Sequence, residues 1–254
     1  LSLHICAADE HEAAGEKKYK ERLERLMSTP KPDSDYLRQK YQEEREKRLR
    51  ADKNGQYVPL ETLGGKLQVE EKYADEKAAN RGALNEECEV LVIGGGFGGL
   101  LTSFQLMEKM GVEELKMGAG GLRIVEKGGD VGGTWYWNRY PGAMCDVESY
   151  SYMPLLEELN YVPLDKYAKS PEILQHAKNI AAKHNLTEAA VFQTVVTGCV
   201  WEEGDLRWSV ETDRGDHFRA RFIVLANGIL TTPKVPQIPG IETFGGHAFH
   251  TSRW

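Results

Sequence analysis

A β-branched segment that runs directly into a glycine-rich loop constrains the fold of this chain more than any other feature. Residues 89–93 (EVLVI) have the composition of a short buried strand, residues 94–99 (GGGFGG) follow without a spacer, and a helix-forming segment starts at Leu100. Gly94, Gly96 and Gly99 fit the pattern G-x-G-x-x-G. In that pattern the first glycine permits a tight turn, the second lets the backbone approach a pyrophosphate, and the third lets the helix pack on the strand. The helix N-terminus then offers free amides to an anion. The order of these segments predicts an α/β fold that binds a dinucleotide.

A second predicted strand, residues 122–126, ends in an acidic residue, Glu126. An acid at this place binds the ribose hydroxyls of a dinucleotide, so Glu126 is the candidate for that role. It lies further along the chain than the ~20 residues usual for this acid. We assign the extra length to a loop over residues 116–121. Gly118 and Gly120 look like the start of another fingerprint, but the position of its third glycine is Arg123.

The chain beyond these strands carries further helix and strand signals. Ser170 as an N-cap and Pro171 as the first helical residue predict a helix that runs to about residue 183. Three strand-like segments follow, at residues 191–201, 206–212 and 217–225. The glycine loop alone does not decide between FAD and NAD. The strand-rich stretch favours a flavoprotein-type domain, in which such an insertion separates the halves of the nucleotide fold.

The N-terminal third differs in composition from the rest. Charged residues number 36 in the first 87 residues and 35 in the remaining 167. Residues 35–50 mix opposite charges among good helix formers, which predicts a solvent-exposed helix. Its apolar stripe is thin and consists of Leu37, Tyr41 and Leu49. We expect this helix to pack on the main domain or on a partner rather than to form a specific binding site.

The overall composition excludes several function classes. The net charge of -7 and a pI of about 5.6 argue against a nucleic-acid or anionic-membrane binder. No apolar run approaches the ~20 residues of a membrane helix, and residues 1–10 lack the features of a secretory signal. The four cysteines, Cys6, Cys88, Cys145 and Cys199, suit reduced thiols better than a disulfide frame or a zinc site. We therefore expect a cytoplasmic protein without a metal site.

An unusual aromatic string, residues 132–146 (GGTWYWNRYPGAMCD), follows the second strand. Trp135, Trp137 and Tyr140 could wall a flat ring, and Asp146 could place a charge beside it, although a lone aromatic cluster more often belongs to the core. The string resembles the GGxWxxxxYPGxxxD motif of the Baeyer–Villiger monooxygenases. Residues 244–254 add a second match, to that family's FxGxxxHxxxW fingerprint, at Phe244, Gly246, His250 and Trp254.

The resemblance covers about residues 87–254 and implies a fold. That fold is a Rossmann-like FAD-binding α/β domain, with a parallel sheet, helices and an antiparallel three-strand meander. Residues 1–86 resemble the charged, mainly helical extension of the subgroup that acts on large cyclic ketones and steroids. The family also needs a second glycine loop for NADPH and an arginine that steadies the peroxyflavin, both beyond the fingerprint. We therefore expect residues 87–254 to be an incomplete FAD-binding domain from which the NADPH domain is absent.

The resemblance also implies a chemistry, which FAD supplies. In this family NADPH reduces the flavin, O2 adds at its C4a position, and the peroxide converts a small-molecule ketone to an ester or lactone. By position, the glycines of the loop would hold the pyrophosphate and Glu126 the adenosine ribose. The resemblance also implies that the flavin is contacted by Thr134, Trp135, Tyr136 and Trp137, and the adenine by Val196. It places Asp146 and Tyr152 beside the isoalloxazine, and Met144, Cys145 and Asp146 near the nicotinamide nucleotide. Asp146 is the catalytic candidate, and His250 would have a conformational role in the linker between nucleotide domains.

Two alternatives stay open beside this enzyme. One is a truncated, catalytically silent FAD-binding or interaction protein whose charged N-terminal region docks a partner. The other is a related flavin monooxygenase that oxidises nitrogen or sulfur, against which the fingerprint with Trp254 argues. As the FAD-binding part of the first enzyme, the 254-residue chain alone is expected to bind FAD poorly and not to turn over.

Overall fold

The computed structural model describes residues 17–22, 24, 25, 28, 33–59, 73, 74, 81–230 and 232–254, and of residues 111–114 it describes the backbone only. The chain divides into two compact units, Leu1–Gln56 and Tyr57–Trp254. The domain boundary expected between residues 86 and 87 stays a prediction. Cys6 lies outside the described residues.

The first unit contains the predicted charged helix, α2 (Ser34–Arg48), followed by a short 3-10 helix, η1 (Lys53–Gln56). Asp33 caps α2, because its carboxylate accepts a hydrogen bond from the amide of Asp35 at 2.9 Å. No residue of α2 is buried. The helix is held by local side-chain pairs such as Lys47 with Glu44, which contribute a few tenths of a kcal/mol each, about 0.2–0.5.

The second unit is built on a six-stranded sheet with the order β4-β3-β2-β7-β6-β5. Its strands are β2 (Asn85–Ile93), β3 (Leu122–Val125), β4 (Ala190–Val191), β5 (Val196–Glu202), β6 (Arg207–Thr212) and β7 (His217–Leu225). Strands β4, β3, β2 and β7 are parallel, whereas β5, β6 and β7 form an antiparallel meander. Strand β7 belongs to both parts, so the meander and the parallel sheet are continuous. This confirms the predicted fold class.

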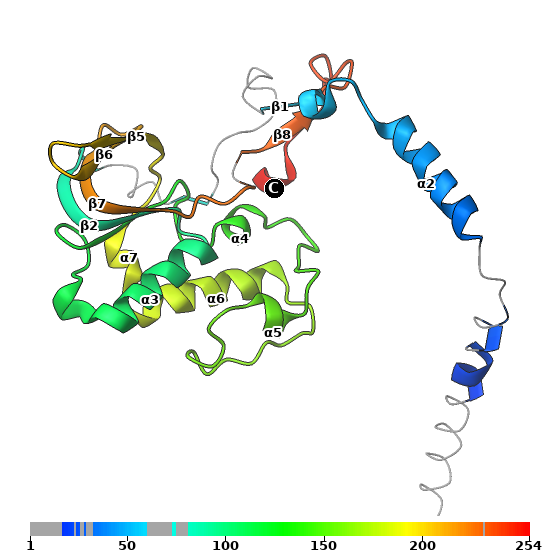
Figure 1. Cartoon of the computed structure of the whole chain (residues 1–254), viewed down its shortest axis with the longest axis horizontal. Helices are drawn as coiled ribbons and strands as arrows, with labels where there is room; N and C mark the ends of the chain where they lie inside the picture. Colours follow the sequence, from blue (N-terminus) through cyan, green and yellow to red (C-terminus); the bar gives the residue numbers. More distant parts are fainter. Residues whose placement is uncertain are drawn as a thin grey trace, which may run out of the picture. The chain divides into compact units, whose positions relative to one another are not determined.

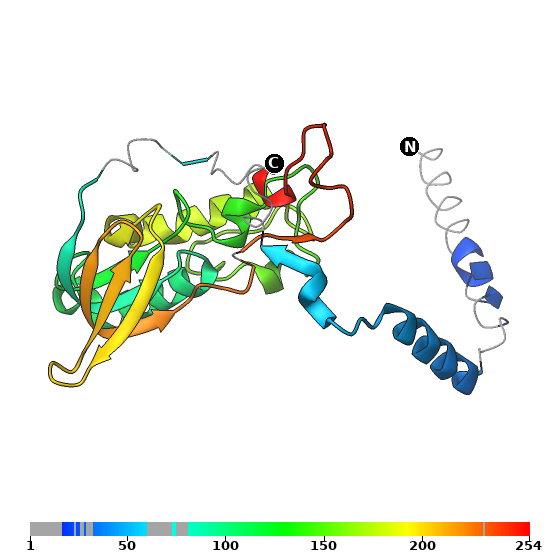
Figure 2. The ribbon, with the colours of Figure 1, turned by 90° about the horizontal axis from the view of Figure 1, so that it is seen from above.

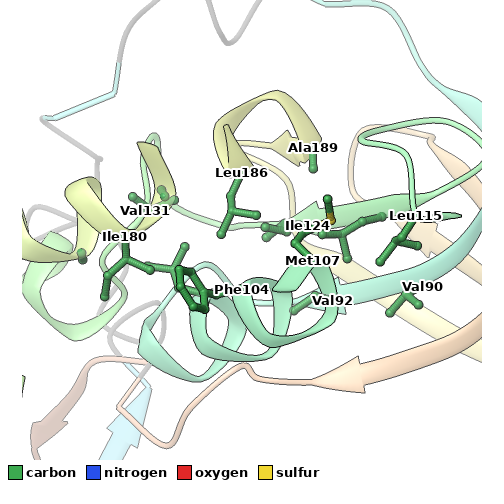
Figure 3. Packing of buried hydrophobic residues seen from close by; sticks show 14 residues of the cluster. Val90, Val92, Phe104, Met107, Leu115, Ile124, Val131, Ile180, Leu186 and Ala189 are labelled. Atoms are coloured by element: carbon green, nitrogen blue, oxygen red, sulfur yellow. The ribbon is translucent and has the colours of Figure 1, made fainter. Parts of the chain in front are cut away.

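Helices pack on one face of the parallel strands (Figures 1 and 2). They are α3 (Phe97–Glu114), α6 (Ser170–Lys183) and the short α7 (Leu186–Ala189). Val90 and Val92 of β2 point into the core beneath these helices, where Phe104 and Ile180 also lie (Figure 3). Leu91 points the other way, as the alternation of a strand requires, and packs in a second cluster with residues of the meander.

The remaining elements are short. Strand β1 (Tyr57–Pro59) pairs with β8 (Lys234–Pro236) in a separate two-stranded sheet. Helices α4 (Thr134–Trp137) and α5 (Ser149–Tyr152) belong to the aromatic region, and a 3-10 helix, η3 (Thr251–Arg253), lies near the end of the sequence. Among the described residues, no helix has the length and apolar character needed to cross a membrane.

Three predicted boundaries are corrected by the structure. The strand expected over residues 191–201 is divided into β4 and β5, because residues 192–195 leave the parallel sheet before the chain joins the meander. Helix α3 starts at Phe97, inside the glycine loop, rather than at Leu100. The N-cap of α6 is Lys169, not Ser170, whose buried hydroxyl donates to the carbonyl oxygen of Asn138 at 2.8 Å instead.

Candidate functional site

A pocket of about 500 Å³ lies where the parallel strands β2, β3 and β7 end. Strands β2 and β3 end in Ile93 and Val125, which line it, and Ala226 follows β7, as ligand sites in open α/β sheets require. The lining residues are Ile93, Gly94, Gly96, Phe97, Gly98, Val125, Glu126, Lys127, Gly132, Gly133, Thr134, Trp135, Trp137, Tyr152, Thr194, Val195, Val196, Ala226, Asn227, Gly228, Leu230 and Thr232. Its volume lies within the range of about 300–1,000 Å³ that is usual for cofactor sites.

The glycine loop forms one wall of this pocket, and its glycines have different tasks. Gly94 has a φ of +111°, and a Cβ there would lie 2.5 Å from the carbonyl oxygen of Ala226, so the turn out of β2 needs glycine. A Cβ on Gly99 would lie 1.9 Å from the Gly94 oxygen. Gly99 therefore lets α3 approach the strand and does not line the pocket. A Cβ on Gly96 would meet only Gly133, at 3.4 Å, so the lack of a side chain here leaves room for a ligand to approach the backbone.

The N-terminus of α3 faces the same space with free backbone donors. The first hydrogen bond of the helix runs from the Leu100 amide to the Gly96 carbonyl oxygen at 2.9 Å. The amides of the residues before Leu100 have no acceptor within the helix, as at any helix start. Phe97 and Gly98 both line the pocket. An 18-residue helix that begins at a pocket in this way favours a bound phosphate.

Glu126 follows β3 and is only 6% exposed. Its carboxylate accepts hydrogen bonds from the amides of Gly95 at 2.5 Å and Gly128 at 2.6 Å. These bonds fix the side chain against the glycine loop. A carboxylate offers about four lone-pair sites, which suits a group that binds both backbone amides and ligand hydroxyls.

Two aromatic side chains of the string 132–146 also line the pocket, together with Tyr152. The indole nitrogen of Trp135 donates to the Tyr152 hydroxyl at 2.8 Å, and the two rings meet edge to face at 5.7 Å. Burial raises the pKa of Tyr152, which keeps its phenol protonated. Trp137 lines the pocket, and the guanidinium of Arg253 lies 4.2 Å from the centre of its ring system. The aromatic wall is therefore held by polar partners at both of its tryptophans.

Five of the predicted site residues do not line this pocket: Gly99, Tyr136, Met144, Cys145 and Asp146. Tyr136 is buried behind the wall, where its hydroxyl accepts from the Gly129 amide at 2.9 Å. Cys145 is buried in the same aromatic cluster. Met144 lines a second cavity of about 560 Å³ beside the start of α6. Asp146 is exposed, but its charge contributes to the raised pKa of Tyr152.

The other eight predicted residues do come together at the pocket: Gly94, Gly96, Glu126, Thr134, Trp135, Trp137, Tyr152 and Val196. His250, by contrast, caps η3 by accepting from the Ser252 amide at 3.1 Å, and burial lowers its pKa. The structure thus divides the predicted site residues into eight that line the pocket and five that do not. The individual roles expected for these residues stay predictions.

Sequence reasoning missed two segments that line the pocket. Ala226, Asn227 and Gly228 follow β7, and a strand that stops at Asn-Gly at the same edge as the glycine loop was the signal that could have revealed them. Thr194 and Val195 lie in the connection between β4 and β5. No local pattern marks that connection as part of a site.

Comparisons with known proteins agree with the motifs. The chain is 45% identical over 222 residues to Baeyer–Villiger monooxygenase 4 of a Dietzia species, and 44% identical over 225 residues to an FAD-binding monooxygenase of Hypomyces subiculosus. Each alignment covers 87% of this chain and 34% or 35% of the relative. A polycyclic ketone monooxygenase from Thermothelomyces thermophila matches in structure with a TM-score of 0.79 at 40% identity, over 87% of this chain and 36% of that one.

These matches confirm the resemblance to the Baeyer–Villiger monooxygenases. The chain spans about a third of the length of the relatives it matches. No protein-family model matches it.

Proposed function

We propose that this chain is the FAD-binding part of a Baeyer–Villiger-type monooxygenase, an enzyme that uses FAD, NADPH and O2 to convert a ketone to an ester or lactone. One observation carries the proposal above all: the glycine loop, Glu126 and the aromatic string meet in a single pocket at the carboxyl ends of the strands. The similarity to a Baeyer–Villiger monooxygenase and to a polycyclic ketone monooxygenase supports the reaction class and a large cyclic ketone as substrate.

The pocket residues fit the chemistry of FAD. The donors at the start of α3 suit the pyrophosphate, the Glu126 carboxylate suits the ribose hydroxyls, and the wall of Trp135, Trp137 and Tyr152 suits a flat ring. When bound, FAD supplies the redox chemistry, and the protein binds and orients it. The partly buried Tyr152 phenol, protonated because its pKa is raised, could donate a hydrogen bond toward the ring. We assign Val196 to the adenine of FAD. We assign Asp146, the catalytic candidate, to the isoalloxazine ring, on the side where Tyr152 lies.

The remaining assignments are also proposals. We infer that residues 1–86 form an extension to the FAD-binding domain of residues 87–254, and that Met144 and Cys145 lie toward the nicotinamide nucleotide of the complete enzyme. We further propose a cytoplasmic location. The free thiols of Cys88, Cys145 and Cys199, the cysteines that the structure describes, support a reducing compartment.

The first test is an absorption titration of the purified chain with FAD. We expect weak binding, seen as a bound flavin spectrum only at high FAD concentration. We expect Glu126→Gln to weaken FAD binding further, by about ten- to a hundredfold, since charge-assisted hydrogen bonds of about 1.5–3 kcal/mol are lost. Glu86→Gln is a matched control, because Glu86 is also a glutamate with hydrogen-bond donors on its carboxylate but pairs with Arg123 away from the pocket. Wild-type chain that binds no flavin, or equal losses in both variants, would contradict the proposed FAD site.

A second measurement concerns the reaction. With FAD and NADPH present, consumption of NADPH should not depend on a polycyclic ketone for this chain alone. An enzyme in which this chain is joined to an NADPH-binding domain should show that dependence and form an ester or lactone. Oxidation by that enzyme at nitrogen or sulfur, without reaction at the ketone, would favour the alternative monooxygenase.

A further inference from the structure

The segment between β4 and β5 reaches the pocket through Thr194, Val195 and Val196, yet it has no regular secondary structure before Val196. Its backbone is attached to the strand ends on one side, where the Thr194 amide donates to the Glu126 carbonyl oxygen at 3.0 Å. On the other side the Val195 amide donates to the Asp213 carboxylate at 2.8 Å, and the Asp213 amide donates back to the Val195 carbonyl oxygen at 2.9 Å. The position of this segment therefore depends on the turn between β6 and β7.

A buried ion pair organises that turn. Both terminal nitrogens of Arg81 donate to the carboxylate of Asp216 at 2.5 Å, and the Asp216 side chain is fully buried. Asp216 also accepts from the Leu84 amide and the Thr212 hydroxyl, each at 2.8 Å. Four donors on one buried carboxylate fix its place, because an unsatisfied charge there would be costly.

The same arginine contacts the pocket wall directly. One terminal nitrogen of Arg81 donates to the Thr194 hydroxyl at 2.9 Å, while that hydroxyl donates to the Phe192 carbonyl oxygen at 2.8 Å. Thr194 is 1% exposed and lines the pocket. Arg81 thus joins the buried carboxylate of the turn to the segment that forms the pocket wall, with a planar fork that a lysine ammonium cannot reproduce.

We propose that Arg81 and Asp216 are positioning residues that hold residues 194–196 against the adenosine part of FAD. The inference rests on the proposed function, since it assumes that the pocket takes FAD with its ribose at Glu126. Thr194 is hydrogen-bonded to the backbone of Glu126, so the segment lies at the ribose end. Arg81 and Asp216 do not line the pocket and act through Thr194 and Val195.

A second ion pair of the same unit provides the control. Arg123 donates to Glu86 at 2.7 and 2.9 Å, and both side chains are largely buried. This pair joins β3 to β2, and neither residue lines the pocket. Its loss should disturb the sheet without moving residues 194–196.

The test compares FAD with FMN, which lacks the adenosine part, in titrations of wild type, Asp216→Asn, Arg81→Lys and Glu86→Gln. We expect Asp216→Asn and Arg81→Lys to raise the Kd for FAD by about tenfold, because the adenosine wall is no longer preorganised. The Kd for FMN should change by less than about twofold, and Glu86→Gln should alter neither ligand by more than that. Equal losses of FAD and FMN affinity, or unchanged FAD affinity, would overturn the inference. Arg81→Lys keeps the positive charge, so it provides a folded variant where Asp216→Asn does not fold.

A measurement without flavin separates this inference from the proposed function. The amides of Gln193, Thr194 and Val195 are all hydrogen-bonded, so their hydrogen exchange reports the order of the segment. We expect exchange there to be about tenfold faster in Arg81→Lys and unchanged in Glu86→Gln. Failure of wild type to bind FAD, with this exchange difference present, would reject the FAD site but keep the positioning role. Unchanged exchange would reject the positioning role itself.

Discussion

Two glycine-rich loops of the second unit look alike in sequence but differ in what surrounds them. Residues 94–99 leave the carboxyl end of β2 and enter α3, whereas residues 116–121 enter the amino end of β3. Each loop contains at least one glycine that packing demands. A Cβ would lie 1.9 Å from a carbonyl oxygen at Gly99 and, in the second loop, at Gly121. Only the first loop lines the pocket.

This difference shows that a glycine-rich sequence indicates tight packing, whereas a position at the carboxyl end of a parallel strand indicates a binding site. A loop at the carboxyl end of a parallel strand meets the start of a helix and the ends of the neighbouring strands. Gly120, in the loop of residues 116–121, is required by neither packing nor a ligand, since a Cβ there would meet nothing within 4 Å. Its freedom serves a turn with a φ of +78° and not a ligand.

The largest expected effect concerns the glycines that packing demands. Gly99→Ala should lower the free energy of unfolding by about 3 kcal/mol, since the new methyl group collides with the Gly94 backbone. Gly121→Ala should be similarly damaging, because its collision is with the Lys116 backbone. Urea denaturation measures both. Gly98→Ala is the control, since its Cβ would make only an ordinary contact at 3.8 Å with Ala226. A stable Gly99→Ala variant would refute this account of the loop.

Acid should affect residues 192–196, which the Asp216 network holds, before it affects the loop of residues 116–121. Burial alone would raise the pKa of Asp216, but hydrogen bonds from Arg81, Leu84 and Thr212 lower it to about 2. An unfolded aspartate titrates near 3.9, so this group stabilises the fold by about 2 kcal/mol above pH 4. That stability is lost as the pH falls through 2.

Denaturation by urea between pH 5 and pH 2 measures this loss, and Asp216→Asn should remove that part of the pH dependence. Hydrogen exchange should show earlier loss of protection in residues 192–196 than in residues 116–121 over the same range. Simultaneous loss in both segments would mean that the Asp216 network is not local.

The smallest effects come from the two glycines that make few contacts. Gly96→Ala should weaken FAD binding by about tenfold, because the added methyl group occupies space in the pocket. It should change the free energy of unfolding by less than about 0.5 kcal/mol. Gly120→Ala should do the reverse. It should cost about 1–2 kcal/mol through its positive φ and leave FAD binding unchanged. Flavin titration and thermal unfolding of both variants would show whether the two effects are independent.

Local sequence patterns predict much of the fold and about half of the site. The strand, glycine loop and helix at residues 89–110 could be predicted because turn, strand and helix signals follow one another directly. The position of Glu126 in the site could be predicted because it ends the strand that follows the glycine loop and its helix. Thr194 could not, because its contact with Arg81 joins residues 113 apart in sequence. Asp146 lies outside the pocket lining although its charge reaches Tyr152, so its predicted place beside the ring stays a prediction, since a motif gives proximity along the chain and not the direction of a side chain.

The central place of β2 in the sheet has a consequence for synthesis on the ribosome. One neighbour, β3, follows it closely, whereas the other, β7, carries Arg219, which pairs with Glu87 across 132 residues of chain. At a translation rate of about 5–20 residues per second, β2 waits about 7–26 seconds for that neighbour. During this interval an apolar strand has an open edge, which is the condition under which nascent chains aggregate. Chaperone occupancy on the growing chain should therefore end when β7 emerges, rather than when the glycine loop and its helix are complete.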